Sequence, residues 1–197
     1  MKRFLLVSSL CALCGLTDPA RAVTVFSDNF NADTPALNKT TFLGGWTVSN
    51  GTVDLVDFSV GRLIDLDGSS GDAGVFSKTL TLDAGVPYSA TFGLAGSQRG
   101  SAVETVVASF GTTTQTFTVA AAEAFSTRTL TFTPTTTDSY SLTFANSGGD
   151  NVGALLDNVS IDSNAVAAIP EPETYALMLV GLAAVTAMQR RRKGSRA

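Results

Sequence analysis

The chain has 197 residues, no histidine and a formal net charge of −4. Without histidine it cannot form a Ser-His-Asp triad, use a histidine general base or build the usual zinc site. Between residues 23 and 165 there are 14 acidic and five basic residues, a balance of −9. Such an acidic segment repels nucleic acid, so we expect no nucleic-acid partner.

The start of the chain has the three parts of a secretory signal peptide. Two basic residues follow Met1, residues 4–16 are apolar, and Ala20 and Ala22 form a small-residue cleavage site. We therefore expect residues 1–22 to be exported by the Sec translocon and removed by signal peptidase. An uncleaved transmembrane helix is disfavoured because the apolar stretch is short and is interrupted. Both cysteines lie in this leader, so the mature chain would have none.

Residues 23–162 alternate between apolar and polar side chains and are rich in Thr, Val and Phe. This alternation is typical of half-buried strands, which are separated here by clusters of Gly, Asn, Asp and Ser. We expect one all-β domain, an antiparallel β-sandwich or jelly roll, followed by a short linker over residues 163–169. The expected strands are Val23–Phe26, Gly45–Val48, Thr52–Val56, Arg62–Leu66, Gly74–Leu82, Tyr88–Leu94, Thr105–Phe110, Thr114–Val119, Ser126–Thr133, Tyr140–Ala145 and Ala154–Ile161. The expected inward side chains are Val75, Leu80, Phe92, Leu94, Val107, Phe117, Val119, Leu130, Phe132, Leu142, Phe144 and Leu156.

The end of the chain joins two prolines, an uncharged apolar segment and a basic cluster. The prolines restrict the backbone, and the apolar segment over residues 174–189 predicts one C-terminal transmembrane helix. The basic cluster within residues 190–196 would stop this helix at the cytoplasmic side. The stop residues are Arg190, Arg191, Arg192 and Lys193. About 15 helical residues span about 22 Å, less than the roughly 30 Å hydrocarbon core, which favours transient retention over permanent anchorage.

The order of these parts over residues 170–197 resembles the PEP-CTERM sorting signal of exported bacterial proteins. The resemblance implies that Pro170, Glu171 and Pro172 are recognised by exosortase, a membrane-embedded protease or transpeptidase. It also implies transient retention in the inner membrane, removal of the helix and its basic cluster, and final delivery to the cell surface or extracellular matrix of a Gram-negative-type bacterium. An ordinary tail anchor remains the alternative, because it needs the same apolar helix and basic stop.

Four segments of the domain, residues 26–30, 66–74, 94–100 and 148–161, are similar to galactose-binding-like jelly rolls that are often joined to this tail. In such domains the first and last strands lie side by side and often hold one structural calcium ion. The resemblance places Asp28 and Asp157 at the matching positions. Backbone carbonyls would supply the remaining oxygen ligands of a calcium ion.

Carbohydrate sites combine an aromatic platform with planar polar side chains, and such side chains lie in Gly-rich loops of this chain. The candidate ligand-binding residues are Trp46, Gln98, Arg99, Asp150 and Asn151, with Tyr88 and Tyr140 as further aromatic side chains. A polysaccharide is the expected partner of this site. A single Trp beside two glycines is also typical of a core position, so both roles stay open for Trp46.

Catalysis would require paired carboxylates, which glycosidases use as acid and nucleophile or base. Asp54 with Asp57 and Asp65 with Asp67 are such pairs, but the sequence indicates no neighbour that raises one pKa. Asp65 and Asp67 also begin a segment similar to a calcium loop, which lacks the carboxylate at its twelfth position and predicts a solvated turn. We therefore expect no enzyme, but an exported structural or carbohydrate-binding module associated with exopolysaccharide or biofilm matrix. A glycan-active enzyme and a permanently anchored periplasmic protein are the alternatives.

Overall fold

The computed structural model describes residues 22–59, 61–100, 102–164 and 172–194. Residues 1–21 of the expected signal peptide, with Ala20, lie outside this described part, and so do Pro170 and Glu171 of the expected recognition motif. The chain forms two compact units, a domain over residues 21–165 and a unit that includes the C-terminal helix.

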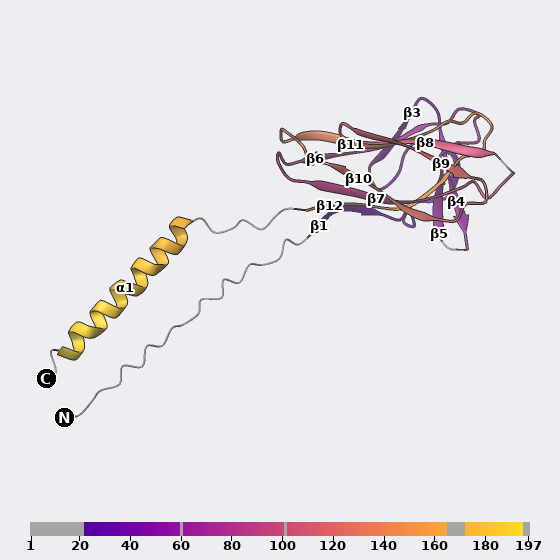
Figure 1. Cartoon of the computed structure of the whole chain (residues 1–197). Coiled ribbons are helices and arrows are strands. Elements are labelled where there is room, and N and C mark those ends of the chain that lie inside the picture. Colours follow the sequence, from indigo (N-terminus) through magenta and orange to yellow (C-terminus); the bar gives the residue numbers. More distant parts are fainter. Residues whose placement is uncertain (1–21, 60, 101, 165–171, 195–197) are drawn as a thin grey trace. The chain divides into compact units, whose positions relative to one another are not determined.

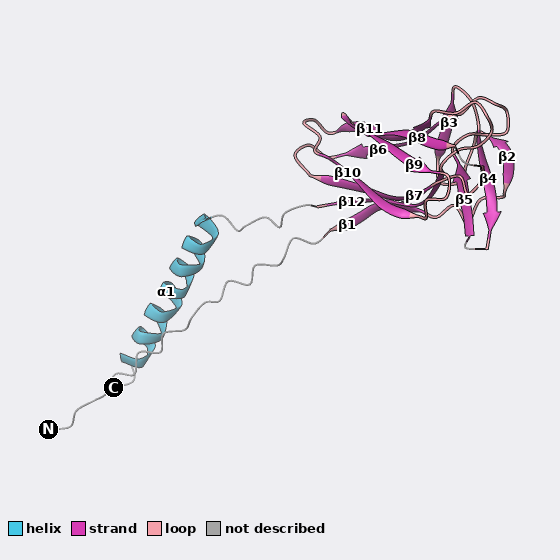
Figure 2. Cartoon of the chain, turned by 45° about the vertical axis from the view of Figure 1, so that its right-hand side comes forward, coloured by secondary structure: helices cyan, strands magenta, loops and turns pink. Residues whose placement is uncertain are grey.

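The domain consists of two antiparallel sheets, which appear as two layers in Figures 1 and 2. The seven-stranded sheet has the order β10-β7-β12-β5-β4-β2, with β1 paired to β12, and the five-stranded sheet has the order β3-β6-β11-β8-β9. The strands are β1 (Val23–Asp28), β2 (Ala36–Lys39), β3 (Trp46–Ser49), β4 (Val53–Phe58), β5 (Gly61–Asp65), β6 (Val75–Leu82), β7 (Tyr88–Ala95), β8 (Val103–Phe110), β9 (Thr113–Ala120), β10 (Ser126–Phe132), β11 (Asp138–Asn146) and β12 (Leu155–Ser163). The expected all-β antiparallel sandwich is confirmed.

The core lies between the two sheets and is formed by alternate residues of each strand. In β7, for example, Ala90, Phe92 and Leu94 are fully buried, and the residues between them are half-buried. Phe92 contacts Phe144 of the other sheet edge to face, with the ring centroids 4.8 Å apart. Such aromatic pairs add to the burial of apolar surface that holds the sheets together.

Two of the expected inward side chains were assigned to the wrong face. Phe76 and Val106 are fully buried in the core, whereas their neighbours Val75 and Val107 are only half-buried and belong to the opposite face of their strands. In both places two apolar residues stand next to each other, so the alternation does not tell which one faces inward. Strand β2 was missed, because its four residues do not alternate and Asn38 has a φ of 52°.

The expected C-terminal helix is present as α1 (Pro172–Gly194). Proline is favoured in the first turn of a helix, where its missing N–H is not needed. Leu177, Leu179 and Val180 are exposed on this helix. The sequence predicts that this helix crosses the membrane. However, none of the helices that the structure describes is long and apolar enough to do so. The charged residues within α1, Glu173 and the basic cluster, confine its apolar part to the short segment between them.

Candidate functional site

The middle of β12 is interrupted where three neighbouring strands meet it. On one edge β12 pairs with β7, and on the other edge it pairs first with β5 and then with β1. The pairing to β7 shifts between Asp157 and Ser160, and Asn158 has a φ of 50°. This bulge turns the Asn158 side chain outward, since Asn is one of the few residues that tolerates a left-handed backbone.

A first hollow of about 440 Å³ lies beside this bulge, over β7 and β10. Gly93 lines this hollow, and a Cβ on it would lie 3.3 Å from the Phe125 ring and 3.2 Å from the Asp157 carbonyl. The absence of a side chain on Gly93 therefore leaves room for Phe125, which is 42% exposed. The hollow is lined by Thr91, Phe92, Gly93, Phe125, Ser126, Thr127, Asp157 and Asn158.

A second hollow of about 530 Å³ lies toward β1 and is also lined by Asn158. The two hollows share Asn158 as a lining residue, and together they are called the Asn158 groove here. The groove combines one exposed aromatic ring with carboxylate, amide and hydroxyl groups, which are the groups that bind sugars. The second hollow is lined by Ser27, Asp28, Asn29, Ala32, Asn158, Val159 and Ser160.

Asp28 and Asp157, the expected calcium ligands, both line this groove. Strands β1 and β12 pair as expected, and Asp28 lies opposite Val159. Burial raises the pKa of Asp157, the hydrogen bond from the Asn158 amide lowers it, and the negative charge of Asp28 raises it further.

The two carboxylates alone do not complete a calcium site. Asp28 accepts hydrogen bonds from the Phe30 amide at 2.8 Å and from Trp46 Nε1 at 3.1 Å, and Asp157 accepts two from Asn158. Calcium takes six to eight oxygen ligands. The part of the chain that the structure describes contains no group of three or more His, Cys, Asp or Glu side chains placed to hold a metal ion.

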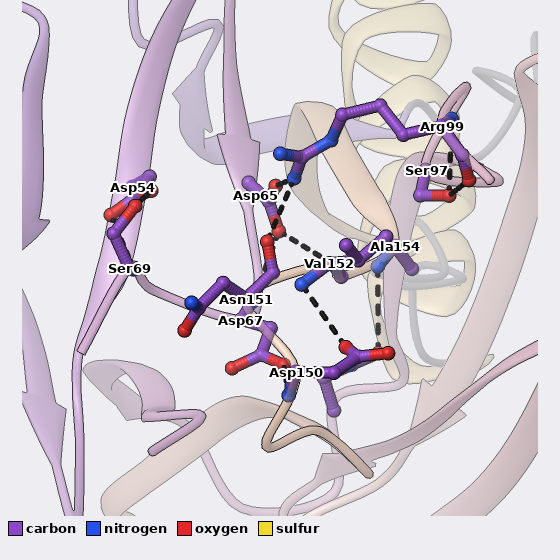
Figure 3. Close-up of polar contacts among 12 residues, drawn as sticks. Asp54, Asp65, Asp67, Ser69, Ser97, Arg99, Asp150, Asn151, Val152 and Ala154 are labelled. Atoms are coloured by element: carbon purple, nitrogen blue, oxygen red, sulfur yellow. Dashed lines mark hydrogen bonds and ion pairs between the residues drawn. The ribbon is translucent and has the colours of Figure 1, made fainter. Parts of the chain in front are cut away.

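A second cluster of polar residues joins the segments that follow β5, β7 and β11, as Figure 3 shows. Asp65, at the end of β5, accepts from the amides of Asp67 at 3.1 Å and Gly153 at 2.9 Å. Its carboxylate also pairs with Arg99, which donates to the Asn151 carbonyl at 3.1 Å. Asp65 therefore fixes three loops at one point.

Asp67 and Asp54 extend this network. Asp67 is fully buried, and its Oδ2 accepts from the amides of Gly149 at 2.8 Å and Asp150 at 3.3 Å. Asp54 accepts from the amide and the hydroxyl of Ser69, at 3.1 and 2.6 Å. These carboxylates replace the hydrogen bonds that the loop backbone would otherwise make with water, so their role is to order the loops.

The five residues expected to bind sugar have different roles in the structure. Trp46 is 2% exposed and stacks on Phe76 with the centroids 4.3 Å apart, so its ring cannot serve as a sugar platform. Gln98 donates to the carbonyls of Gly96 and Glu123, which closes a turn.

The other three expected sugar-binding residues belong to the loop network. Arg99 bonds Asp65 and the Asn151 carbonyl, and the Asp150 side chain accepts from the Val152 amide at 3.1 Å. None of these residues lines the Asn158 groove. The sequence analysis missed Phe125 and Asn158, because an aromatic residue before a strand and an Asn within one carry no signal until the fold brings them together.

The expectation that no neighbour raises the pKa of the paired carboxylates was wrong for Asp65. Burial raises the pKa of Asp65 to about 7 and the negative charge of Asp54 adds to this, although the Asp67 amide and the Arg99 guanidinium lower it. Burial likewise raises the pKa of Glu104, which is 3% exposed. At Asp65 the cause is the closed loop network rather than an open site, since the side chain is fully buried.

This pKa shift predicts that the protein loses stability as the pH rises from about 4 to about 7. The folded state binds the Asp65 proton more tightly than the unfolded state, so the stabilisation is complete below the ordinary pKa of 3.8 and is lost by about pH 7. Asp65→Asn cannot titrate, and its melting temperature should fall less than that of the natural protein between pH 5 and pH 8. Equal falls in thermal unfolding experiments would show that Asp65 is ionised throughout this range.

Comparison with known proteins supports the interpretation of the tail. Residues 168–193 match the PEP-CTERM protein-sorting motif. The chain therefore carries a sorting motif that begins just before Pro170 and ends in the basic cluster. By sequence, no curated protein matches the chain.

Solved structures with carbohydrate-binding modules are similar to the sandwich domain. The CBM22-1 xylan-binding domain of Paenibacillus barcinonensis Xyn10C is 16% identical with a TM-score of 0.51, over 74% of this chain and 97% of that domain. The CBM22-1 and GH10 modules of Clostridium thermocellum xylanase 10B are 17% identical with a TM-score of 0.48, over 75% of this chain and 30% of that one. At such identities the likeness to the first domain establishes the β-sandwich fold alone.

Proposed function

We propose that this protein is an exported, non-enzymatic module whose sandwich domain binds glycans in the Asn158 groove. The observation that carries the proposal is the groove itself, in which the half-exposed Phe125 ring stands beside Asp157 and Asn158. An aromatic ring binds the apolar face of a sugar, while carboxylates and amides accept and donate hydrogen bonds to its hydroxyls. The similar domain from Paenibacillus barcinonensis is described as xylan-binding, which agrees with this class of ligand.

The matched motif in the tail supports a route through exosortase. Exosortase would recognise Pro170, Glu171 and Pro172 within the matched motif, while the apolar part of α1 holds the tail in the inner membrane. The basic cluster would remain on the cytoplasmic side until the tail is cut, after which the domain reaches the cell surface or the extracellular polysaccharide. A short apolar segment suits such transient retention, because a mismatch with the bilayer weakens permanent insertion.

The two alternatives, a glycan-active enzyme and a permanently anchored protein, require different features of the chain. A glycan-active enzyme needs two accessible carboxylates with a substrate between them, whereas each pair expected from the sequence includes a carboxylate that is buried in the loop network, Asp54 in one pair and Asp65 and Asp67 in the other. A permanently anchored protein would keep α1 and its basic cluster in the mature chain. Calcium binding by Asp28 and Asp157 is a further proposal, supported by their positions on the paired strands β1 and β12.

Replacing Phe125 with alanine tests the groove. We expect Phe125→Ala to weaken binding to xylan about tenfold, because the sugar loses its aromatic contact. The measurement is a depletion assay in which the full-length protein, kept in detergent, is mixed with a panel of insoluble polysaccharides. Phe58→Ala is the matched control, since Phe58 is also 42% exposed and lines neither hollow. If no polysaccharide in the panel retains the natural protein, the proposed function is wrong.

A further inference from the structure

The outer face of the five-stranded sheet carries no charged side chain. Alternate residues of β3, β6, β8, β9 and β11 face away from the core, are half-buried or exposed, and are all Ser, Thr, Ala or Val. The domain as a whole is strongly acidic, with 14 acidic and five basic residues. At this face a second copy of the domain therefore meets no like charge, whereas two acidic surfaces repel each other.

The face has an apolar centre with hydroxyl groups around it. Val75, Ala145 and Val107 are neighbours in register on β6, β11 and β8, and they are called the apolar strip here. The row beside the strip crosses all five strands and consists of hydroxyl residues alone, which are Thr47, Ser77, Thr143, Ser109 and Thr114. An apolar centre within a polar rim is the usual composition of a protein–protein interface.

Burying this face against a partner would cost little free energy. Thr79 and Ser141 share a hydrogen bond between their hydroxyls at 2.8 Å, and Ser109 and Thr114 share one at 3.0 Å. These hydroxyl pairs keep their hydrogen bonds when water is excluded, so no donor is left unsatisfied there. The side chains of the face are short, so they also lose less rotamer entropy on binding than Lys or Glu would.

The area of the face is sufficient for a stable dimer. Strands β6, β8 and β9 have eight residues each. With a rise of about 3.3 Å per residue and about 4.8 Å between strands, the five strands present about 600 Å². Two copies packed face to face would bury about 1,200 Å² in total, which reaches the size of stable, specific interfaces. Twisted sheets pack face to face in the same way inside β-sandwiches.

We propose that two copies of the chain associate through the outer faces of their five-stranded sheets, with the apolar strips at the centre. A two-fold axis that lies in the interface and passes Ala145 brings the strip of one copy onto the strip of the other. This interface goes beyond the proposed glycan binding, because the Asn158 groove is formed by strands of the other sheet. Both grooves stay free in the dimer, which can therefore join two glycan chains.

Sedimentation equilibrium of the full-length protein in density-matched detergent tests the dimer. We expect Val107→Asp to raise the Kd of the dimer at least about tenfold, because it brings like charges into the buried centre. Thr129→Asp is the matched control, since Thr129 is exposed on β10 of the other sheet and lines neither hollow. Far-UV circular dichroism confirms that both variants are folded. A monomeric natural protein, or equal Kd values for the two variants, would overturn the proposal.

Cross-linking tests the same interface with a smaller change in packing. Ala145→Cys places one thiol of each copy beside the two-fold axis, so a short bis-maleimide should join two copies of this variant. Thr129→Cys should give no such dimer, and any background from Cys11 and Cys14 is the same in both variants. Equal yields would place the contact elsewhere and contradict the proposal. A monomer that still binds xylan would contradict the dimer but keep the proposed function.

Discussion

Trp46→Ala is expected to lower the free energy of unfolding by about 3–5 kcal/mol, the range observed for large aromatic residues removed from a core. Trp46 is 2% exposed, stacks on Phe76 and contacts Phe30 with the centroids 5.9 Å apart. Its Nε1 also donates to Asp28 of β1, so that this side chain of the five-stranded sheet holds a strand of the other sheet. Urea unfolding followed by circular dichroism measures the loss.

Trp46→Phe separates the two contributions of this side chain. The phenyl ring keeps the contact with Phe76 but loses the hydrogen bond to Asp28, so a smaller loss of about 1–2 kcal/mol is expected. If Trp46→Ala lowers the free energy of unfolding by less than about 1 kcal/mol, a core role is contradicted. Such a small loss is typical of substitutions on the surface. Trp46 would then return to the list of possible sugar platforms.

Gly153→Ala is expected to destabilise the domain by about 3 kcal/mol through the loop network. A Cβ at this position would collide with the amide nitrogen of Asp67 and with Asp65 Oδ1. The same oxygen accepts the hydrogen bond from the Gly153 amide, so the collision also breaks this bond. Thermal unfolding at pH 5, below the raised pKa of Asp65, measures the effect.

Gly85→Ala is the matched control for this substitution. Gly85 has a φ of +73° and no neighbouring atom within 4 Å of the added Cβ. The substitution therefore costs only the free energy of placing an alanine in a left-handed backbone conformation, about 1–2 kcal/mol. Equal losses of stability for the two variants would mean that the loops after β5 and β11 can move apart without a loss of free energy. The buried carboxylates would then not fix these loops.

The strand pattern was predictable because the domain alternates over long stretches. Runs such as Tyr88–Leu94 place every second residue in the core, and no helical period competes with them. The pattern failed where it was ambiguous, at paired apolar residues such as Val106 and Val107, and at the short strand β2. A single sequence also gives no strand order, so the division into sheets of seven and five strands was not predictable.

The sorting tail was predictable because its signal is local. A motif of consecutive residues, an apolar segment and a basic cluster are all visible without knowledge of the fold. The residues of the groove come instead from β1, β7, β10 and β12 and from the loop before β10, which only the fold brings together. Of the expected ligand residues, Asp28 and Asp157 line the groove. These two could be expected together, because the resemblance placed them on neighbouring first and last strands.

Asp150 and Asn151 show why residue types alone do not define a binding site. Polar residues in Gly-rich loops are needed both for binding ligands and for replacing the hydrogen bonds of the loop backbone. The structure shows the second role for the Asp150 carboxylate, which accepts from the Val152 amide, and for the Asn151 backbone carbonyl, which accepts from Arg99. The sequence does not distinguish these roles, because they depend on which groups lie within about 3 Å of the side chain.

The mass of the mature protein tests most directly the claim that this chain is an exported module with a temporary tail. We expect the protein recovered from exosortase-bearing cells to begin at Val23 and to lack the basic cluster at residues 190–196. Intact-mass spectrometry of the surface fraction gives both ends in one measurement. A chain that retains Arg196 and Ala197 in those cells, or that stays in the cytosol with its leader uncut, would contradict the account.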